Sequence, residues 1–288
     1  MNPSITVIVP VGRVDDALAQ QLIALIAQDI ETSVEFVIAQ NTTDRAAATE
    51  LALLVDSLDD SRVRVVVAGD RRGAAYARNV GASNARGAVL AFCDGDDLVE
   101  PTWLGQLVGG LDHYDAVGGR LIDSGLTDRQ RSVRPPATPD ALPTFLGVPY
   151  IVSASMAIGR ETFTAVGGFD ENLVRCEDIA FSWALLDQGF QLGFVSEARV
   201  AYLHRADMVG MLIQHFHYGR GMSQVLMRYG VPEGDGRARP TYRGLLRANG
   251  QSVGRRSLLS TLRRVALAAG RLTEIANELP HRRRWAAS

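Results

Sequence analysis

The sequence predicts a mixed α/β fold, with a mostly parallel sheet flanked by helices and a helical extension at the C-terminal end. Short apolar runs rich in β-branched residues alternate with helical periodicity through the first third of the chain, a pattern typical of βαβ units. Two long segments of helical periodicity dominate the end of the chain instead. Ligands of parallel sheets bind beyond the carboxyl ends of the strands, so the residues that follow each strand are the first candidates for a site.

The first predicted strand is the β-branched run at 4–9, which Pro10 stops and which has the continuous apolarity of a buried parallel strand. A helix follows at 15–29, where leucines recur at helical spacing. The further elements of this part are a strand at 35–39, a polar cluster at 40–44, a helix at 45–58, a strand at 63–67, a helix at 74–85 and a strand at 88–93.

The middle of the chain departs from this alternation. The segment at 129–143 is rich in proline and charge, and we expect a long surface loop there. The elements expected after it are a strand at 150–158, a turn at 167–170, a helix at 177–188 with Gly189 as its C-cap, strand-like runs at 192–195 and 198–203, a helix at 209–229, a linker at 231–239 and a helix at 255–279.

The composition is that of an ordinary globular protein. Of the 288 residues, 47% are hydrophobic and 22% are charged, which excludes disordered, collagen-like and coiled-coil chains. Two cysteines cannot form a disulfide framework or a four-cysteine zinc site, and they indicate a reducing compartment. The start lacks the pattern of a signal peptide, and no apolar run has the length of a membrane span. We therefore expect a cytoplasmic protein.

Charge is unevenly distributed along the chain. Residues 1–204 hold 15 basic and 27 acidic side chains, and residues 205–288 hold 15 and 5, so the two parts carry about −12 and +10. Every one of the basic residues is arginine, which excludes mechanisms that need a Schiff-base or P-loop lysine. The basic part lacks interleaved aromatic residues, which argues against nucleic acid as a partner.

The last predicted helix has an apolar stripe with Arg263, Arg264 and Arg271 away from it. This pattern is compatible with packing on the domain with the arginines in solvent, with a homodimer interface, or with an anionic membrane surface. We favour packing or a partner interface over peripheral contact with the inner face of the membrane.

Two groups of acidic residues are candidates for chemistry. Asp94, Asp96 and Asp97 directly follow an apolar strand, and carboxylates so close together are stabilised by a divalent cation. The alternative is a turn that caps the next helix. Glu177 and Asp178 begin a helix, where they either interact with its dipole or supply a general base at a cleft.

Taken together, the motifs of the chain resemble those of family 2 glycosyltransferases of the GT-A fold, over roughly residues 4–230. The motifs are Val-Ile-Val-Pro at 7–10, Gln-Asn-Thr-Thr-Asp at 40–44, Arg-Gly-Ala-Ala-Tyr-Ala-Arg-Asn-Val-Gly at 72–81, Phe-Cys-Asp-Gly-Asp-Asp-Leu-Val-Glu-Pro at 92–101, Val-Gly-Gly-Phe-Asp-Glu at 166–171 and Glu-Asp at 177–178.

The resemblance implies a Rossmann-like sheet with three regions. Residues 1–110 would form the half that binds the nucleotide sugar, 111–230 the half that binds the acceptor, and 231–288 a linker and a basic amphipathic tail. The proline-rich segment at 129–143 is then our candidate for a lid or for acceptor recognition.

The resemblance also implies catalytic roles. Asp94 matches the first acid of the Asp-x-Asp motif, near the ribose or base of the donor, and Asp96 matches the second, which holds Mg²⁺ or Mn²⁺ against the diphosphate. Asp178, preceded by Glu177, matches the general base that deprotonates the acceptor hydroxyl during an inverting displacement. His204 resembles a histidine that adds a metal contact in some members, and an ordinary loop histidine is the alternative.

Donor-binding residues follow from the same resemblance, with two departures. Gln40 stands where the family often has an aspartate that reads uracil, and Pro10, Val11 and Arg13 stand in a segment that often reads Pro-x-Tyr-Asn. An amide can still bind a base edge, and Arg13 is placed to reach the diphosphate. Gly95, Arg72 and Arg78 complete the expected donor contacts, with surface ion pairing as the alternative for both of these arginines.

The implied function is metal-assisted transfer of a sugar from a nucleotide donor to a glycan, lipid-linked or small-molecule acceptor. A nicotinamide-dependent enzyme would need a Gly-x-Gly-x-x-Gly turn after the first strand, which Pro10–Asp15 does not supply. An Asp-x-Asp phosphatase would carry its motif on the first strand and use a downstream base, often lysine. A non-catalytic sugar-nucleotide or glycan-binding module on the same fold is the remaining alternative.

Overall fold

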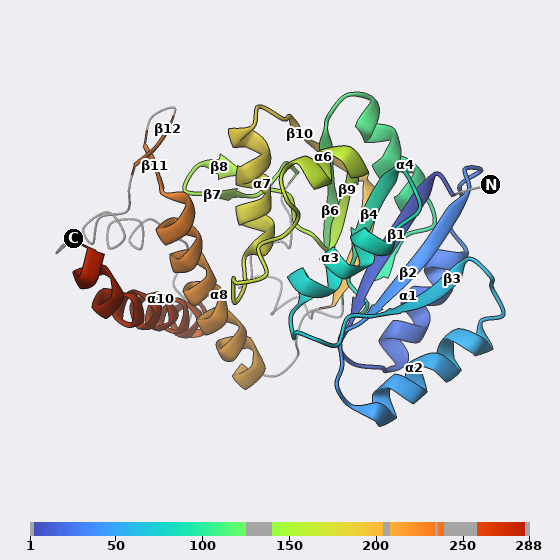
Figure 1. The fold of residues 1–288 in the computed structure, drawn as a ribbon, viewed down its shortest axis with the longest axis horizontal. Coiled ribbons are helices and arrows are strands. Elements are labelled where there is room, and N and C mark those ends of the chain that lie inside the picture. Colours follow the sequence, from blue (N-terminus) through green and yellow to red (C-terminus); the bar gives the residue numbers. More distant parts are fainter. Residues whose placement is uncertain (1–2, 125–139, 204–207, 234–235, 239–257, 286–288) are drawn as a thin grey trace.

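The computed structural model describes residues 3–124, 140–203, 208–233, 236–238 and 258–285. Figure 1 shows a twisted sheet with helices on both faces and, to one side, the helices α8 (Met208–Tyr229) and α10 (Leu258–Trp285). The order of the strands in the sheet is β3-β2-β1-β4-β9-β6-β10-β5.

Four parallel strands form the N-terminal part of this sheet. Strand β1 pairs with both β2 and β4, and β2 pairs with β3. The strands are β1 (Ile5–Val11), β2 (Val34–Gln40), β3 (Val63–Val67) and β4 (Val89–Cys93). They confirm the predicted βαβ pattern, with boundaries within two residues of the expected ones.

The sheet changes direction beyond β4. Strand β9 (Ser155–Gly159) lies antiparallel between β4 and β6 (Ala116–Ser124), and β6 pairs in parallel with β10 (Leu192–Leu203). The short β5 (Leu98–Val99) adds an antiparallel edge to β10. The strand predicted at 150–158 therefore begins five residues later than expected, and the runs expected at 192–195 and 198–203 form one strand, whose pairing is irregular between Val195 and Arg199.

Alternate residues of β1 serve two separate apolar layers. Val7 and Val9 pack in a cluster with the leucines of α1, whereas Ile8 packs in a second cluster that includes Phe92. The first cluster lies under α1 (Asp16–Ile26), α2 (Arg45–Ser57) and α4 (Trp103–Gly109), which the short helix η1 (Gly110–Asp112) continues. The second lies under α3 (Ala74–Asn84), α6 (Arg160–Ala165) and α7 (Glu177–Asp187). Because period-2 alternation fills both faces, the strands show the continuous apolar runs of buried parallel strands.

The structure confirms one of the elements predicted for the middle and end of the chain and differs from the prediction for another. The helix at 177–188 is confirmed as α7, and Gly189 has a φ of 86°, the left-handed conformation of a glycine that ends a helix. Most of the loop predicted at 129–143 lies outside the described residues. The segment predicted as a linker at 231–239 contains the paired strands β11 (Val231–Glu233) and β12 (Gly236–Ala238), and β7 (Thr144–Phe145) pairs with β8 (Val148–Pro149).

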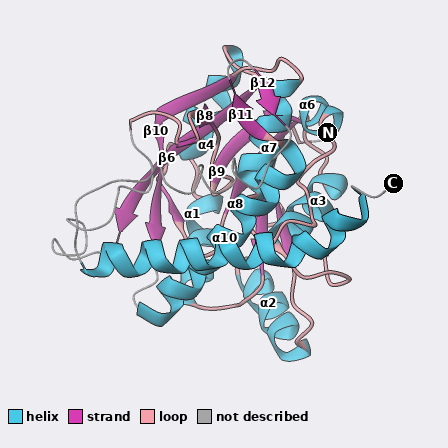
Figure 2. Cartoon of the chain, turned by 90° about the vertical axis from the view of Figure 1, so that its left-hand side faces the viewer, coloured by secondary structure: helices cyan, strands magenta, loops and turns pink. Residues whose placement is uncertain are grey.

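The orientation predicted for the last helix is wrong. Arg271 is buried and Glu274 forms an ion pair with Arg220 of α8 at 2.7 Å, while Val265 and Leu272 are exposed. Arg271 and Glu274 of α10 thus face α8 instead of solvent. Figure 2 shows α10 crossing the molecule in front of α8. No described helix is long and apolar enough to cross a membrane.

Candidate active site

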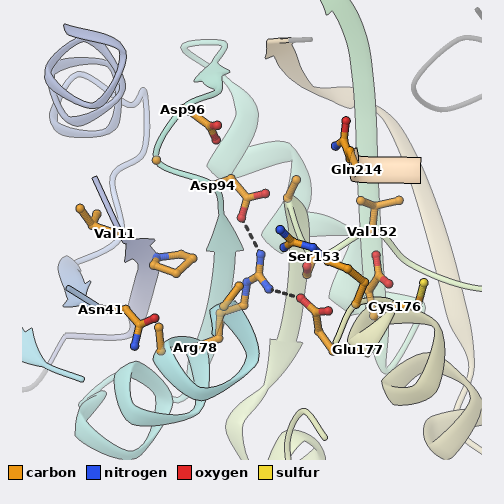
Figure 3. Close-up of a pocket in the computed structure, with 18 of the residues that line it drawn as sticks. Val11, Asn41, Arg78, Asp94, Asp96, Val152, Ser153, Cys176, Glu177 and Gln214 are labelled. Carbon is orange, nitrogen blue, oxygen red and sulfur yellow. Dashed lines mark hydrogen bonds and ion pairs between the residues drawn. The ribbon is translucent and has the colours of Figure 1, made fainter. Parts of the chain in front are cut away.

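A cavity of about 360 Å³ opens at the carboxyl ends of β1 and β4, where the two parts of the sheet meet (Figure 3). Its walls come from the ends of these strands, the start of α7 and the inner side of α8. The residues that line it are Pro10, Val11, Gly12, Asn41, Ala74, Ala77, Arg78, Asp94, Gly95, Asp96, Val152, Ser153, Ala154, Arg175, Cys176, Glu177, Asp178, Tyr202, Gln214 and Tyr218.

The first acidic group is held by the loop between β4 and β5. The apolar strand ends at Cys93, so the next residues emerge at the edge of the sheet, and Asp94 and Asp96 line the cavity. The buried side chain of Gln21 fixes this loop, because its amide nitrogen donates to the carbonyl of Asp94 at 3.1 Å and its oxygen accepts from the Val99 amide at 3.0 Å. A buried amide with both ends satisfied holds the loop in one shape.

The second acidic group stands at the start of α7, on the other side of the cavity. Cys176 precedes the helix with a φ of 67°, and Glu177 and Asp178 form its first turn. Burial, together with the neighbouring charge of Glu177, raises the pKa of Asp178 to about 7. One oxygen of Asp178 accepts from the amide of Ile179 at 2.8 Å. Asp178 therefore has the proton affinity of a base that works near neutral pH.

Arg78 joins the two acidic groups. Its guanidinium donates to Asp94 at 2.5 Å and to Glu177 at 2.8 Å, and the side chain is only 3% exposed (Figure 3). It also lies over the ring of Phe169, 5.7 Å from the ring centre. Ion pairing, one of the two alternatives for Arg78, is thus present, but the arginine is buried instead of lying on the surface, and its contact with the donor stays a prediction. The two ion pairs fix the distance between the Asp-x-Asp loop and the start of α7.

The other residues predicted to contact the nucleotide-sugar donor differ in whether they line the cavity. Pro10, Val11 and Gly95 line the cavity, and Gln40 does not. Arg13 is highly exposed and pairs with Asp15 at 2.5 Å, outside the lining.

Arg72 donates to the hydroxyl of Thr43 at 3.2 Å and is also absent from the lining, so donor contact by Gln40, Arg13 and Arg72 stays a prediction. His204 lies outside the described residues.

Sequence reasoning missed several lining residues. Asn41 connects the end of β2 to the loop before α3. Its amide nitrogen donates to the carbonyls of Ala68 and Arg71 at 2.5 and 2.7 Å, and its oxygen accepts from the Gly73 amide at 2.8 Å. The available signal was its position as the first residue after β2. The cavity residues Ser153, Arg175, Tyr202, Gln214 and Tyr218 had no motif to mark them.

The carboxylates of this site suit a hard divalent cation whose remaining ligands are phosphate oxygens. Mg²⁺ is commonly held by one or two carboxylates plus substrate phosphates, without a full cage of protein ligands. Asp96 supplies such a carboxylate, whereas Asp94 already neutralises Arg78. Among the described residues no cluster of three or more potential ligands occurs.

Comparisons with known proteins identify the family and the fold. The family model described as Glycosyl transferase family 2 matches residues 6–166. Glycosyltransferase AglE of Haloferax volcanii is 25% identical over 237 residues, which cover 78% of this chain and 75% of AglE. The pre-mycofactocin glycosyltransferase of Mycobacterium tuberculosis is 26% identical over 171 residues, 55% of this chain but 36% of that protein, so the match spans about a third of the relative's length.

Solved structures show the same fold. The mannosyltransferase PcManGT from Pyrobaculum calidifontis, in complex with GDP-Man and Mn²⁺, superposes with a TM-score of 0.63 at 18% identity, covering 97% of this chain and 76% of its own. S. aureus TarS in complex with UDP-GlcNAc has a TM-score of 0.58 at 18% identity, covering 80% and 68%. The fold is that of GT-A glycosyltransferases. Because the family model matches more than half of the sequence, the chain belongs to glycosyl transferase family 2.

Proposed function

We propose that this protein transfers a sugar from a nucleotide-diphosphate donor to an acceptor hydroxyl, with inversion at the anomeric carbon and with help from Mg²⁺ or Mn²⁺. One observation carries the proposal. The Asp-x-Asp carboxylates after β4 and the carboxylate of Asp178 on α7 line the same cavity, although they lie far apart in the sequence.

The donor would bind on the side of β1 and β4. Pro10, Val11 and Asn41 line this side and would contact the nucleoside, and Asp94 and Gly95 lie where its ribose would reach. The named complexes of the structural relatives contain GDP-Man and UDP-GlcNAc, which supports a nucleotide sugar here. A divalent ion held by Asp96 would stabilise the negative charge that develops on the departing diphosphate.

The acceptor would approach from the side of α7. Asp178 would take the proton of the acceptor hydroxyl while that oxygen attacks the anomeric carbon from the face opposite the leaving nucleotide. A single displacement of this kind inverts the configuration. A base with a pKa near 7 is mostly ionised just above neutral pH and still binds a proton well, which is the optimum for general base catalysis.

The same geometry bears on the alternatives. A phosphatase needs a nucleophilic aspartate free to attack phosphorus, whereas Asp94 is engaged by the buried Arg78 at 2.5 Å. A module that only binds sugars or nucleotides does not require a carboxylate with a raised pKa, such as Asp178, opposite the Asp-x-Asp loop. We therefore retain the transferase, acting in the cytoplasm on a glycan, lipid-linked or small-molecule acceptor. A homodimer through α8 and α10 and peripheral membrane contact are secondary proposals.

A thermal-shift panel tests the donor part of the proposal. Ligands that bind the folded state raise its melting temperature by mass action. Nucleoside diphosphates and nucleotide sugars should raise it in the presence of Mn²⁺, and EDTA should remove most of the shift. The nucleotide with the largest shift identifies the base. A panel without any metal-dependent shift would contradict the proposal.

A further inference from the structure

We propose that the α8 side of the cavity binds an anionic group of the acceptor, a phosphate or a carboxylate, through Arg175, with Tyr218 and Gln214 as neutral hydrogen-bond donors. The inference rests on the proposed function and narrows its acceptor class. It starts from a difference between two cavity-lining arginines.

Arg78 and Arg175 are in different electrostatic states. Arg78 is buried and neutralised by Asp94 and Glu177. Arg175 is exposed, lines the cavity and has no ion pair or side-chain hydrogen bond within the part of the chain that the structure describes.

Three acids of the neighbouring segments are already paired with other arginines, whereas Asp178, which lines the same cavity as Arg175, has no ion pair within the described residues. Asp170 pairs with Arg228, Glu171 with Arg71 and Glu274 with Arg220, at 2.6, 3.4 and 2.7 Å. An exposed guanidinium at a cavity, with no ion pair of its own among the described residues, is available to an anionic ligand.

The backbone places Arg175 on the acceptor side. A Cβ added at Gly221 of α8 would overlap the carbonyl oxygen of Arg175, so this glycine lets the loop before α7 lie directly against α8. The charge of Arg175 acts on the groups of α8 as well, because it helps to lower the pKa of His217 and opposes the rise in the pKa of Tyr218. In Figure 3 Gln214 of α8 and Cys176, the neighbour of Arg175, lie across the cavity from Asp94 and Asp96.

Two neutral groups on α8 complete the subsite. The amide nitrogen of Gln214 donates to the hydroxyl oxygen of Tyr218 at 3.2 Å, which leaves the phenol proton for another acceptor. Burial raises the pKa of Tyr218, so the hydroxyl keeps that proton at neutral pH. Arg175, Tyr218 and Gln214 thus offer charged and neutral donors on one wall, the set that binds carboxylate and phosphate oxygens.

The charges around the cavity determine which substrate this wall can take. An anionic acceptor is repelled by Asp96 at the donor end and by ionised Asp178, and it is attracted by Arg175. Arg175 and Asp178 line the same cavity, so an anion bound by Arg175 would place a neighbouring hydroxyl within this cavity, where the base lies. The acceptor is therefore expected to carry its phosphate or carboxylate close to the hydroxyl that receives the sugar.

Calorimetry with the nucleoside diphosphate-loaded protein and Mn²⁺ tests the subsite directly. The probes are methyl glucoside, methyl glucuronide, glucose 6-phosphate and farnesyl diphosphate-linked glucose. The charged probes should bind at least tenfold more tightly than methyl glucoside, and the last two separate a free phosphate from a lipid-linked one. Arg175→Gln should weaken the charged probes at least tenfold and leave methyl glucoside within twofold.

Arg45→Gln is the matched control, because it removes one exposed positive charge at the start of α2, remote from α8, and should change nothing. Tyr218→Phe should weaken the charged probes by a smaller factor. Equal binding of charged and neutral probes, or an Arg175→Gln variant that binds both as the parent does, overturns the subsite.

Donor turnover keeps the two proposals separate. A parent protein that releases no nucleotide from any sugar donor contradicts the transferase, whereas the calorimetric comparison still decides the anion subsite. Normal nucleotide release, with no effect of Arg175→Gln on the KM of charged acceptors, contradicts the subsite alone. The variant's KM for the donor should stay within twofold of the parent value.

Discussion

Arg78 shows how one side chain can couple two motifs that are distant in the sequence. Its guanidinium is almost completely buried between Asp94 and Glu177. Sequence reasoning placed both acids and Arg78 at the site, yet it could not distinguish a buried bridge from a surface pair, because that depends on how α3 packs against α7. Asn41 was missed for a similar reason, since its three backbone contacts involve a loop about thirty residues away.

Removing Arg78 should be costly. Arg78→Ala leaves Asp94 and Glu177 partly buried without their common counter-charge, and breaking such a pair costs about 3 kcal/mol of unfolding free energy. Urea denaturation at pH 8 measures the loss. Arg72→Ala is the control, because Arg72 is exposed and should cost less than about 0.5 kcal/mol. Equal stability of the two variants would contradict the role of the bridge.

The raised pKa of Asp178 predicts the pH dependence of the reaction. A general base acts in its ionised form, so kcat should rise from pH 6 and level off above the pKa of about 7. Glu177→Gln removes a negative neighbour and releases Arg78, and both changes favour ionised Asp178. The rising limb of the kcat profile should therefore move to lower pH. An unchanged or higher midpoint in this variant would refute the assignment.

The secondary-structure elements that were predicted best are those whose own sequence determines their conformation. The strands β1, β2 and β4 are mostly apolar runs buried on both faces, and sequence reasoning located them. Strand β6 escaped prediction because it contains Gly118 and Gly119, which disfavour strands. A Cβ at Gly119 would overlap Ser155 and Ala198, so the neighbouring strands require glycine there.

The orientation of α10 likewise depends on contacts that its own periodicity does not reveal. Gly219 of α8 and Gly270 of α10 bring the two backbones together, because a Cβ at either would overlap a carbonyl of the other helix. Long polar side chains then close the interface around this close approach, as Arg220 and Glu274 do. A helical wheel of α10 alone therefore placed its arginines in solvent.

Substitution at this crossing should separate the two helices. Gly219→Ala puts a methyl group onto the carbonyl of Leu267, and overpacking of this kind costs about 1–3 kcal/mol. Hydrogen exchange should show lost protection in α8 and α10, with the parallel strands unaffected. Gly109→Ala is the matched control at the end of α4, where an added Cβ meets no atom within 4 Å. Full protection of α10 in Gly219→Ala would contradict the described packing.

For the molecule as a whole, the sheet explains why the cavity lies where it does. Strand β9 runs antiparallel to β4. The segment before β9, which contains Ser153, therefore lies beside the end of β4, which Asp94 follows. The family model ends at residue 166, before α7 and α8. The match to PcManGT nevertheless covers 97% of this chain, so the wall formed by α7 and α8 belongs to the shared fold as well.

The central claim is that Asp96 and Asp178 serve the two halves of one reaction, and parallel measurement of donor affinity and transfer rate in Asp96→Asn and Asp178→Asn tests it most directly. Asp178→Asn should lower kcat by a factor of about 10² to 10⁴, the typical contribution of a general base, and keep the donor Kd within twofold. Asp96→Asn should lose the Mn²⁺-dependent part of donor binding. Undiminished transfer by Asp178→Asn, or metal-dependent donor binding that survives Asp96→Asn, would contradict it.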